Sequence, residues 1–314
     1  MIMDSLLEQY LKTFNSIDFE QIVDHPNILI AARFWDENRY RAAKTCYRFM
    51  REIDDLIDNQ KAAKKVISEN EKQLFKENVD WWIKMIFNGG SDNPFQKELT
   101  YTINKFRIPS WPLEAFASSM IYDIYHDGFS SMQSFLEYSK GASVAPAAIF
   151  VHLAGLREER GVYLEPAFDV KEAATSCAIF SYMVHIIRDF QKDQQNNLNY
   201  FADDLIEKHG LDRAFLSKIA GGADIPKGFR SLINEYYIVA DRYRQKTYDC
   251  IKTIWPCLKP HYQLSLEIIF ELYLMVFERI DIKNSNFTTG ELNPTAEETK
   301  RRVYKTIINS RTLN

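Results

Sequence analysis

The sequence that decides the fold is YRFMREIDDLID, residues 47–58, in which an amphipathic helical pattern runs into three aspartates without a turn residue. Because an α-helix rotates by about 100° per residue, Asp54 and Asp58 share one stripe with Arg51. The same stripe continues Tyr47 and other apolar positions three or four residues apart, a spacing that marks the inward face of a helix. Two buried carboxylates without a cation repel each other and lose solvation, so this segment predicts a counter-ion.

The three aspartates at the end of this segment are not equivalent in space. Asp55 is rotated by about 100° from Asp54, so it should face a neighbouring helix or solvent. Only Asp54 and Asp58 are therefore expected to hold a cation from this helix.

A second acidic pair lies further along the chain, in FSYMVHIIRDFQKD, residues 180–193. Asp189 and Asp193 are again four residues apart, and they continue an inward stripe through Tyr182 and His185. Two such helices can face each other and bring four carboxylates together. Carboxylate oxygens suit Mg²⁺, an ion that keeps several waters and is commonly completed by phosphate oxygens. The two segments together predict a magnesium site.

An arginine stands beside each acidic pair, Arg51 in the first and Arg188 in the second. Guanidinium groups next to metal-binding carboxylates suit a polyanion, and a diphosphate fits that description. The surrounding helices are rich in Phe, Tyr, Ile, Leu and Met, which form a core and can also line a long apolar pocket. A charged head and an apolar tail together describe an isoprenyl diphosphate as the substrate.

Composition excludes several other classes of function. The chain has 314 residues, of which 46% are apolar, enough for a sizeable core. The net charge of −4 and the lack of a Lys/Arg-rich run give no reason to expect nucleic acid as a partner. The 4 cysteines lack C-x-x-C spacing and read as reduced thiols. The 6 histidines form no i, i+4 pair, which argues against zinc, and no Glu-x-x-His motif supports a di-iron bundle.

The chain reads as a succession of amphipathic helices without a convincing strand, repeat or domain linker. Short turn clusters such as NGGSDNP at 88–94 separate the helices. We therefore expect one all-helical domain. The expected helices span residues 37–59, 60–87, 94–106, 111–126, 131–155, 170–195, 201–208, 211–220, 228–254 and 260–282.

No segment reaches the roughly 18 uninterrupted apolar residues that a membrane span requires, since the best candidate, residues 142–156, contains Pro146 and His152. The N-terminal segment lacks the basic flank and cleavage site of a signal peptide, so we expect a cytoplasmic protein. Any membrane contact should be peripheral and made by an amphipathic helix near the C-terminus. The basic residues of that helix are Lys300, Arg301, Arg302 and Lys305.

The acidic segments and several other motifs of the chain resemble those of the squalene/phytoene synthases, which are head-to-head prenyl transferases of the class I isoprenoid fold. RFMREIDDLID at 48–58 resembles the first Asp-rich helix of that family. HIIRDFQKDQQNNLNYFADDLIEKHGL at 185–211 resembles the second, with the Tyr that follows it. FLEYSKGASVAPA at 135–147 resembles the kinked Tyr/Gly helix, and LYLMVFERI at 272–280 the late helix with another Tyr. These segments stand in the family's order and cover most of residues 25–282.

The resemblance implies an all-α fold, a single-domain class I isoprenoid synthase helical bundle around a central cavity. It implies three parts, an N-terminal helical segment over residues 1–24, a catalytic domain over 25–282 and a C-terminal tail with a terminal helix over 283–314. Isoprenyl diphosphates would be the partners. The apolar product would be released at a membrane surface.

The resemblance further implies an Mg²⁺-dependent condensation of two farnesyl or two geranylgeranyl diphosphates, with two or three ions completed by substrate diphosphate. One diphosphate departs, the other substrate captures the allylic cation, and a cyclopropylcarbinyl diphosphate forms. That intermediate then rearranges to a squalene-, dehydrosqualene- or phytoene-type product. The metal ligands would be Asp54, Asp58, Asp189 and Asp193.

The same matching gives roles to the other motif residues. Arg51 and Arg188 would bind diphosphate oxygens, and Tyr138 would act near the cation. Tyr200 and Tyr273 would contact the substrate. These assignments follow from the resemblance alone.

Two departures from the family pattern lie near the chemistry. Where the family commonly has a Ser-Lys-Ser-Phe-like phosphate contact, this chain has DHPNILIAARF at 24–34, so that contact is missing or comes from His25 or Asn27. In the second acidic helix the usual Gln and Asn are Tyr182 and His185, which would contact the substrate instead. The departures suggest a divergent bacterial-type branch.

Two other functions stay open. DDLID also spells the D-D-x-x-D motif of chain-elongating prenyl transferases and terpene cyclases, although the second site is neither another such motif nor the Asn/Ser/Glu triad typical of cyclases. A non-catalytic family member that serves in assembly or interaction is the third reading. Intact acidic pairs argue against it, because without metal they would reduce stability.

Overall fold

The described part of the chain folds into helices that run side by side, with one short hairpin. The computed structural model describes residues 2–21, 27–63, 66–88 and 92–311. The helices are α1 (Ile2–Asn15), α2 (Asn27–Ala32), α3 (Glu37–Ala63), α4 (Glu69–Asn88), α5 (Pro94–Lys105), α6 (Ser110–Tyr125), α7 (Met132–Ser139), the π-helical turn η1 (Lys140–Val144), α8 (Ala145–Gly155), α9 (Val170–Gln195), α10 (Asp203–Lys208), α11 (Arg213–Ala220), α12 (Lys227–Ile254), the 3₁₀ turn η2 (Trp255–Cys257), α13 (Pro260–Phe277), α14 (Thr289–Leu292) and α15 (Ala296–Ile308). The hairpin strands are β1 (Arg157–Glu159) and β2 (Val162–Leu164).

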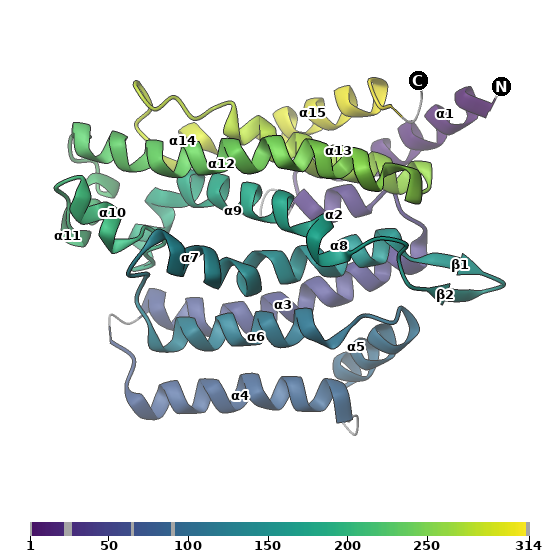
Figure 1. The fold of residues 1–314 in the computed structure, drawn as a ribbon, viewed down its shortest axis with the longest axis horizontal. Coiled ribbons are helices and arrows are strands. Elements are labelled where there is room, and N and C mark those ends of the chain that lie inside the picture. Colours follow the sequence, from purple (N-terminus) through teal and green to yellow (C-terminus); the bar gives the residue numbers. More distant parts are fainter. Residues whose placement is uncertain (1, 22–26, 64–65, 89–91, 312–314) are drawn as a thin grey trace.

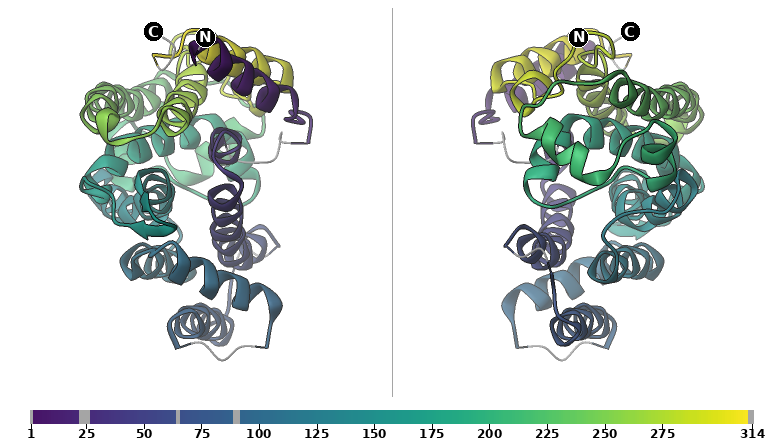
Figure 2. Two further views of the ribbon diagram at one scale, coloured as in Figure 1. Left: turned by 90° about the vertical axis from the view of Figure 1, so that its right-hand side faces the viewer. Right: turned by 90° about the vertical axis from the view of Figure 1, so that its left-hand side faces the viewer.

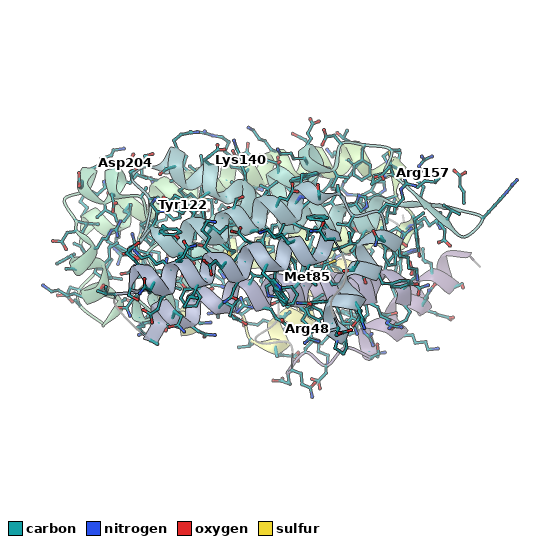
Figure 3. The ribbon with its side chains drawn as sticks, turned by 90° about the horizontal axis from the view of Figure 1, so that it is seen from below. Arg48, Met85, Tyr122, Lys140, Arg157 and Asp204 are labelled. Atoms are coloured by element: carbon teal, nitrogen blue, oxygen red, sulfur yellow. The ribbon has the colours of Figure 1, made fainter. Side chains whose placement is uncertain are left out.

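The helices are arranged in successive layers around α9. Figure 1 shows α12, α13 and α15 along one edge, α9 and α8 beneath them, then α3 and α6, and α4 at the opposite edge. The end-on views of Figure 2 show the two termini at one extreme of the molecule and α4 at the other. In Figure 3, seen from below, α4 with Met85 and α6 with Tyr122 lie side by side on the underside of the bundle. The predicted all-α class is confirmed.

Several helices begin and end where the sequence predicts. Helix α9 spans the predicted range 170–195, and α5, α6 and α12 agree with their predicted ranges to within one residue at each end. The start of α9 is fixed by Asp169, whose side chain accepts a hydrogen bond from the backbone N–H of Glu172 at 2.9 Å. This N-cap satisfies a donor that the first helical turn leaves unpaired.

The predicted helix 60–87 begins too early. Helix α3 continues to Ala63, and α4 begins at Glu69. The Glu71 side chain accepts from the Ser68 backbone N–H at 3.0 Å, and the Ser68 hydroxyl accepts from the Glu71 N–H at 3.4 Å. This capping box starts a new helix inside a stretch whose apolar spacing reads as continuous.

The expectation of no strand is wrong for residues 157–164, which form the β1–β2 hairpin. Its two turn residues, Arg160 and Gly161, have φ of 51° and 79°, the positive values that a tight hairpin turn requires. Each strand has three residues, and β1 is exposed throughout. Such a short charged strand carries no alternating pattern for a sequence reading to find.

The predicted helix 131–155 is interrupted by the π-helical turn η1 between α7 and α8. Gly141 lies in this turn, where an added Cβ would stand 2.2 Å from the carbonyl oxygen of Ala115 on α6. Only glycine permits this approach. The contact is reinforced by the Ser119 hydroxyl, which donates to the Tyr138 carbonyl at 3.0 Å. The turn therefore holds Tyr138 against α6, and it accounts for the kink expected in this helix.

The chain termini meet over α13. Helix α15 packs against α13 and α1, and Val303 and Ile307 share a buried cluster with Tyr10. The predicted boundary at residues 24/25 lies outside the described residues, and the three-part division stays a prediction. The predicted helix 260–282 is shorter than expected, since α13 ends at Phe277.

Helix α15 carries the basic residues expected to contact a membrane surface. Arg302 is not available for such a contact, because its guanidinium is paired with Glu271 at 2.7 Å and Glu278 at 3.0 Å. Lys300, Arg301 and Lys305 are exposed. The membrane contact stays a prediction. Among the described residues, none of the helices is long and apolar enough to cross a bilayer.

Candidate active site

A cavity of about 560 Å³ runs along α9 and is walled by α3, η1, α8, α12 and α13. Both acidic segments open into it. The predicted site residues that line it are Arg51, Asp54, Asp58, Tyr138, Tyr182, His185, Asp189, Asp193, Tyr200 and Tyr273. Arg188 and Asn27 are not among the lining residues, although Ile28 next to Asn27 is. His25 lies outside the described residues.

On α3 the first acidic segment forms one wall of the cavity. The Arg51 guanidinium donates to Asp54 at 2.6 Å and also pairs with Asp55. Asp55 lines the cavity beside Asp54 and Asp58, which was not predicted, although its side chain also faces solvent as expected. The cavity is broad here and takes in more than one stripe of α3, so a rotation of 100° still leaves Asp55 at its mouth. Its side chain is nevertheless 46% exposed, compared with 30% for Asp54.

Asp54 and Asp58 carry more negative charge than the nearby cation neutralises. Burial, followed by the charge of Asp58, raises the pKa of Asp54 to about 8. Burial also raises the pKa of Asp58, against the opposing charges of Arg51 and Lys61. Two carboxylates in this state favour a proton or a metal ion.

On α9 the second acidic segment forms the facing wall, and here Asp189 is already neutralised. Arg188 donates two hydrogen bonds to the Asp189 carboxylate, at 2.7 and 2.8 Å, and His185 Nε2 lies 2.5 Å from Asp189 Oδ2. Burial would raise the pKa of Asp189, but His185 and Arg188 hold it well below the ordinary value. Arg188 therefore lies behind the wall and positions Asp189 instead of pointing its guanidinium into the cavity.

Asp193 is the unneutralised acid of α9. Burial, followed by the charges of Asp189 and Asp58, raises the pKa of Asp193 well above the ordinary value. Since Asp58 belongs to α3, the charge of one acidic helix acts on the other across the cavity. Within the part of the chain that the structure describes, we find no side-chain hydrogen bond to Asp58 or Asp193.

The acidic end of the cavity is an open half-shell. Within the described ranges, no three His, Cys, Asp or Glu side chains stand close enough together to hold a metal ion by themselves. The donor set nevertheless fits a hard cation, because Asp54, Asp58 and Asp193 supply oxygens whose charge is not balanced. An ion bound there would need further oxygens from a ligand. The residues thus fit Mg²⁺ that binds together with a polyanion.

Three tyrosines form the wall between the acidic and apolar ends. The ring centroids of Tyr138 and Tyr182 are 6.5 Å apart, and those of Tyr182 and Tyr200 are 6.3 Å apart. Burial, followed by neighbouring charges, raises the pKa of each hydroxyl well above the ordinary value, so the three phenols stay protonated. On α13, Tyr273 lies near Arg188, and burial raises its pKa to about 12.

Asp123 on α6 accepts a hydrogen bond from the Tyr138 hydroxyl, and no sequence pattern pointed to this pair. A single carboxylate on an apolar helix forms no recurring sequence pattern that could point to it. Asp123 and Tyr138 meet only because η1 lies close to α6. Lys192 and Tyr47 also line the cavity and were not predicted as site residues. Lys192 stands directly before Asp193, so its position beside the second acidic pair could have indicated it.

The stability of the protein without ligand should depend on the charge of Asp123. Burial raises the pKa of Asp123 to about 7, above the roughly 3.9 of an unfolded chain. Between about pH 4 and 7 the folded state therefore keeps a proton that the unfolded state releases, and the free energy of unfolding falls as the pH rises. An Asp123→Asn variant should lose less stability than the wild type between pH 5 and 8 in urea unfolding. Equal losses in the two proteins would contradict this origin.

Away from the acids the cavity is apolar. Its walls there come from α2, the turn after it, α3, α6, α8, α12 and α13. The larger lining side chains are Ile28, Trp35, Met50, Phe116, Met120, Phe150, Val151, Ile251, Ile254, Leu266 and Ile269. One continuous space thus joins a cluster of carboxylates to a long apolar compartment.

The sequence of the chain matches one known protein family. The model of the family described as squalene/phytoene synthase matches residues 25–304. No curated protein sequence matches this chain.

Three solved structures share the fold, which confirms the predicted isoprenoid-synthase type of helical bundle. A dehydrosqualene synthase in complex with ligand has a TM-score of 0.64 and 15% identity, over 95% of this chain and 99% of that one. The squalene synthase HpnC from Alicyclobacillus acidocaldarius has a TM-score of 0.62 and 12% identity, over 85% and 90% of the two chains. YisP from Bacillus subtilis subsp. subtilis strain 168 has a TM-score of 0.60 and 14% identity, over 95% and 97%.

Proposed function

Since this chain belongs to the squalene/phytoene synthase family, we propose that it condenses two farnesyl or two geranylgeranyl diphosphates head to head. The reaction passes through a cyclopropylcarbinyl diphosphate to a squalene-, dehydrosqualene- or phytoene-type product. The observation that carries the proposal is the single cavity in which facing acids on α3 and α9 adjoin an apolar compartment. A diphosphate and a prenyl chain would occupy these two ends.

The proposed cofactor is Mg²⁺, two or three ions per reaction. Asp54, Asp58 and Asp193 would hold it, joined by Asp189 once substrate diphosphate completes the shell. When bound, the metal stabilises the negative charge that develops on the departing diphosphate. Arg51, at the same mouth, would bind diphosphate oxygens.

The remaining residues would act on the hydrocarbon. The rings of Tyr138, Tyr182 and Tyr200 face the cavity, where an aromatic face stabilises a passing carbocation. Their hydroxyls stay protonated, so they would not abstract a proton from the intermediate. Asp123 would orient Tyr138 through the hydrogen bond that it accepts. The apolar walls exclude water, which would otherwise capture the cation.

The direct test is to incubate the purified protein with Mg²⁺ and farnesyl or geranylgeranyl diphosphate. We expect release of diphosphate and a C30 or C40 head-to-head product, identified by mass analysis. Products one prenyl unit longer, formed when isopentenyl diphosphate is added, would instead indicate chain elongation. Cyclised C15 or C20 products would indicate a cyclase.

The chain-elongation and cyclase readings keep one supporting observation, the presence of Asp55 at the cavity beside Asp54 and Asp58. The D-D-x-x-D motif therefore faces the cavity as a whole. The match to the squalene/phytoene synthase family over most of the chain favours the head-to-head reaction. A non-catalytic role would leave all substrates unchanged in the same assay.

Metal and diphosphate should bind together. Because the carboxylates form an incomplete shell, titration of the ligand-free protein with Mg²⁺ should show weak binding. The affinity should rise when a non-hydrolysable prenyl diphosphate is present, by about a hundredfold for a coupling of two to three kcal/mol. Calorimetric titration with and without the analogue measures this coupling. Tight Zn²⁺ binding without any ligand, in preference to Mg²⁺, would contradict the site.

A further inference from the structure

Trp35, Ala173 and Ile254 form a layer at the apolar end of the cavity, here called its floor. Along α9 the lining residues run from Ala173 at this end to Asp189 and Asp193 at the acidic end. At the level of Ala173 the indole of Trp35 enters from the turn between α2 and α3. Ile254 of α12 meets it there. Elements from distant parts of the sequence thus converge on one layer.

Trp35 is held in this layer by a hydrogen bond and by ring contacts. Its Nε1–H donates to the Ser265 hydroxyl at 2.8 Å, and that hydroxyl donates to the Tyr262 carbonyl at 2.7 Å. The indole stands edge-on to the Tyr262 ring with centroids 6.0 Å apart, and its centroid is 6.4 Å from that of Phe150. Ser265 is only 2% exposed, so the acceptor is itself fixed.

A second layer closes the space behind the indole. The guanidinium of Arg39, fully buried, lies 4.5 Å above the Tyr262 ring. The Tyr262 hydroxyl donates to Asp36 at 2.8 Å, and Asp36 also accepts from the Arg39 backbone N–H at the start of α3. The residue before Asp36 is Trp35 itself. The turn that carries the indole is therefore anchored on both sides, and the floor is rigid.

We propose that Trp35, suspended from Ser265, sets the longest prenyl chain that the cavity accepts. The inference rests on the proposed function, since it assumes that the apolar compartment holds a prenyl tail. The indole is the large side chain at the bottom of the compartment, and the buried side chains of Tyr262 and Arg39 lie beyond it. A chain that reaches the ring must stop there.

Simple lengths give the expected limit. Helix α9 rises by about 1.5 Å per residue, so Ala173 and Asp189 are about 24 Å apart along its axis. An extended prenyl chain advances by about 1.2 Å per bond along its length. This value is taken from an extended polypeptide, which advances by about 3.6 Å over the three backbone bonds of each residue. A C20 tail then measures about 18 Å and a C25 tail about 23 Å. The space left for the tail is shorter than about 24 Å, because the indole occupies one end and the diphosphate the other. A C20 tail therefore fits, and a C25 tail does not.

The test measures binding of non-hydrolysable C15, C20 and C25 thiolodiphosphates to the purified full-length chain with Mg²⁺. The wild type should bind the C25 analogue about tenfold or more weaker than the C20 analogue. Trp35→Ala should bind C25 as tightly as C20, while the affinity for inorganic diphosphate stays unchanged. Ser265→Ala, which keeps the indole but removes its acceptor, should give an intermediate result. Trp35→Leu repeats the test should the alanine variant not fold.

Trp82→Ala is the matched control, because Trp82 is a half-buried tryptophan that packs on Phe49 outside the cavity. It should retain the wild-type preference. Equal C20 and C25 binding by the wild type, or an unchanged preference in folded Trp35→Ala and Trp35→Leu, would overturn the inference alone. A folded wild type that binds none of the three analogues would overturn the proposed function, and the inference with it.

Discussion

Turnover should fall by at least about a hundredfold when Asp54 or Asp58 is replaced by asparagine. Each change removes a charge that would hold the metal at the departing diphosphate, an electrostatic effect commonly worth about 3 kcal/mol or more. Burial raises the pKa of both groups, and the charge of Asp58 raises that of Asp54 further. Neutralising either one should therefore make the ligand-free protein more resistant to urea at pH 7, not less. Steady-state turnover at saturating Mg²⁺ and urea unfolding measure the two opposite effects.

Asp55→Asn is the matched control for these variants. Asp55 lies on the same helix, at the same cavity mouth, and shares Arg51 with Asp54, but its side chain is 46% exposed. A charge in contact with water contributes less to the site, so the loss of turnover should stay below about tenfold. Should Asp55→Asn prove as inactive as Asp54→Asn while folded, all three aspartates would act together. The chain-elongating or cyclase reading would then be favoured.

Arg188→Ala should lower the free energy of unfolding by about 3 kcal/mol at pH 7, because it removes two hydrogen bonds from a buried carboxylate and leaves His185 as its remaining partner. Arg188 and Asp189 are paired through two hydrogen bonds, and their side chains are 18% and 10% exposed. His185 and Arg188 together hold the pKa of Asp189 below its ordinary value. Their contribution is therefore complete above about pH 4 and is lost as the pH falls further. Urea unfolding at pH 7 and at successively lower pH measures both.

The double variant Arg188→Ala/Asp189→Ala separates the stability lost through the unpaired charge from the stability lost through packing. Removing the carboxylate together with its partner removes the unpaired charge, so the double variant should be more stable than Arg188→Ala alone. Arg188→Lys keeps the charge with a single donor group and should lie between the wild type and Arg188→Ala. Strictly additive losses in the double variant would contradict the pairing as the source of the effect.

The helical pattern of the chain could be read from its sequence because it is a local property. Helix α9 spans the predicted residues, and the i, i+4 spacing of Asp189 and Asp193 places both on its cavity side whatever its neighbours do. The same reasoning places Asp54 and Asp58 on the cavity side of α3. The acidic end of the candidate site was thus largely predictable.

How much of each helix surface lines the cavity was not predictable, because it depends on how far apart the helices lie. Asp55 lines the cavity since the bundle opens broadly at α3. Arg188, expected to point at a diphosphate, turns to Asp189 instead, and His185 joins the same carboxylate. A sequence pattern gives the direction of a side chain from its own helix, but not the partner that it meets there.

The remaining contacts were decided by the tertiary structure alone. Tyr138 reaches Asp123 because Gly141 in η1 lets this turn approach α6 closely. Trp35 donates a hydrogen bond to Ser265, which lies 230 positions further along the sequence. Such pairs bring together residues whose separation in the chain carries no periodic signal. The sequence by itself determined which helices form and where their acids lie, since the period of a helix is set by its own backbone. The packing of those helices decided how acids are paired and where the cavity ends, since that depends on side chains meeting from distant segments.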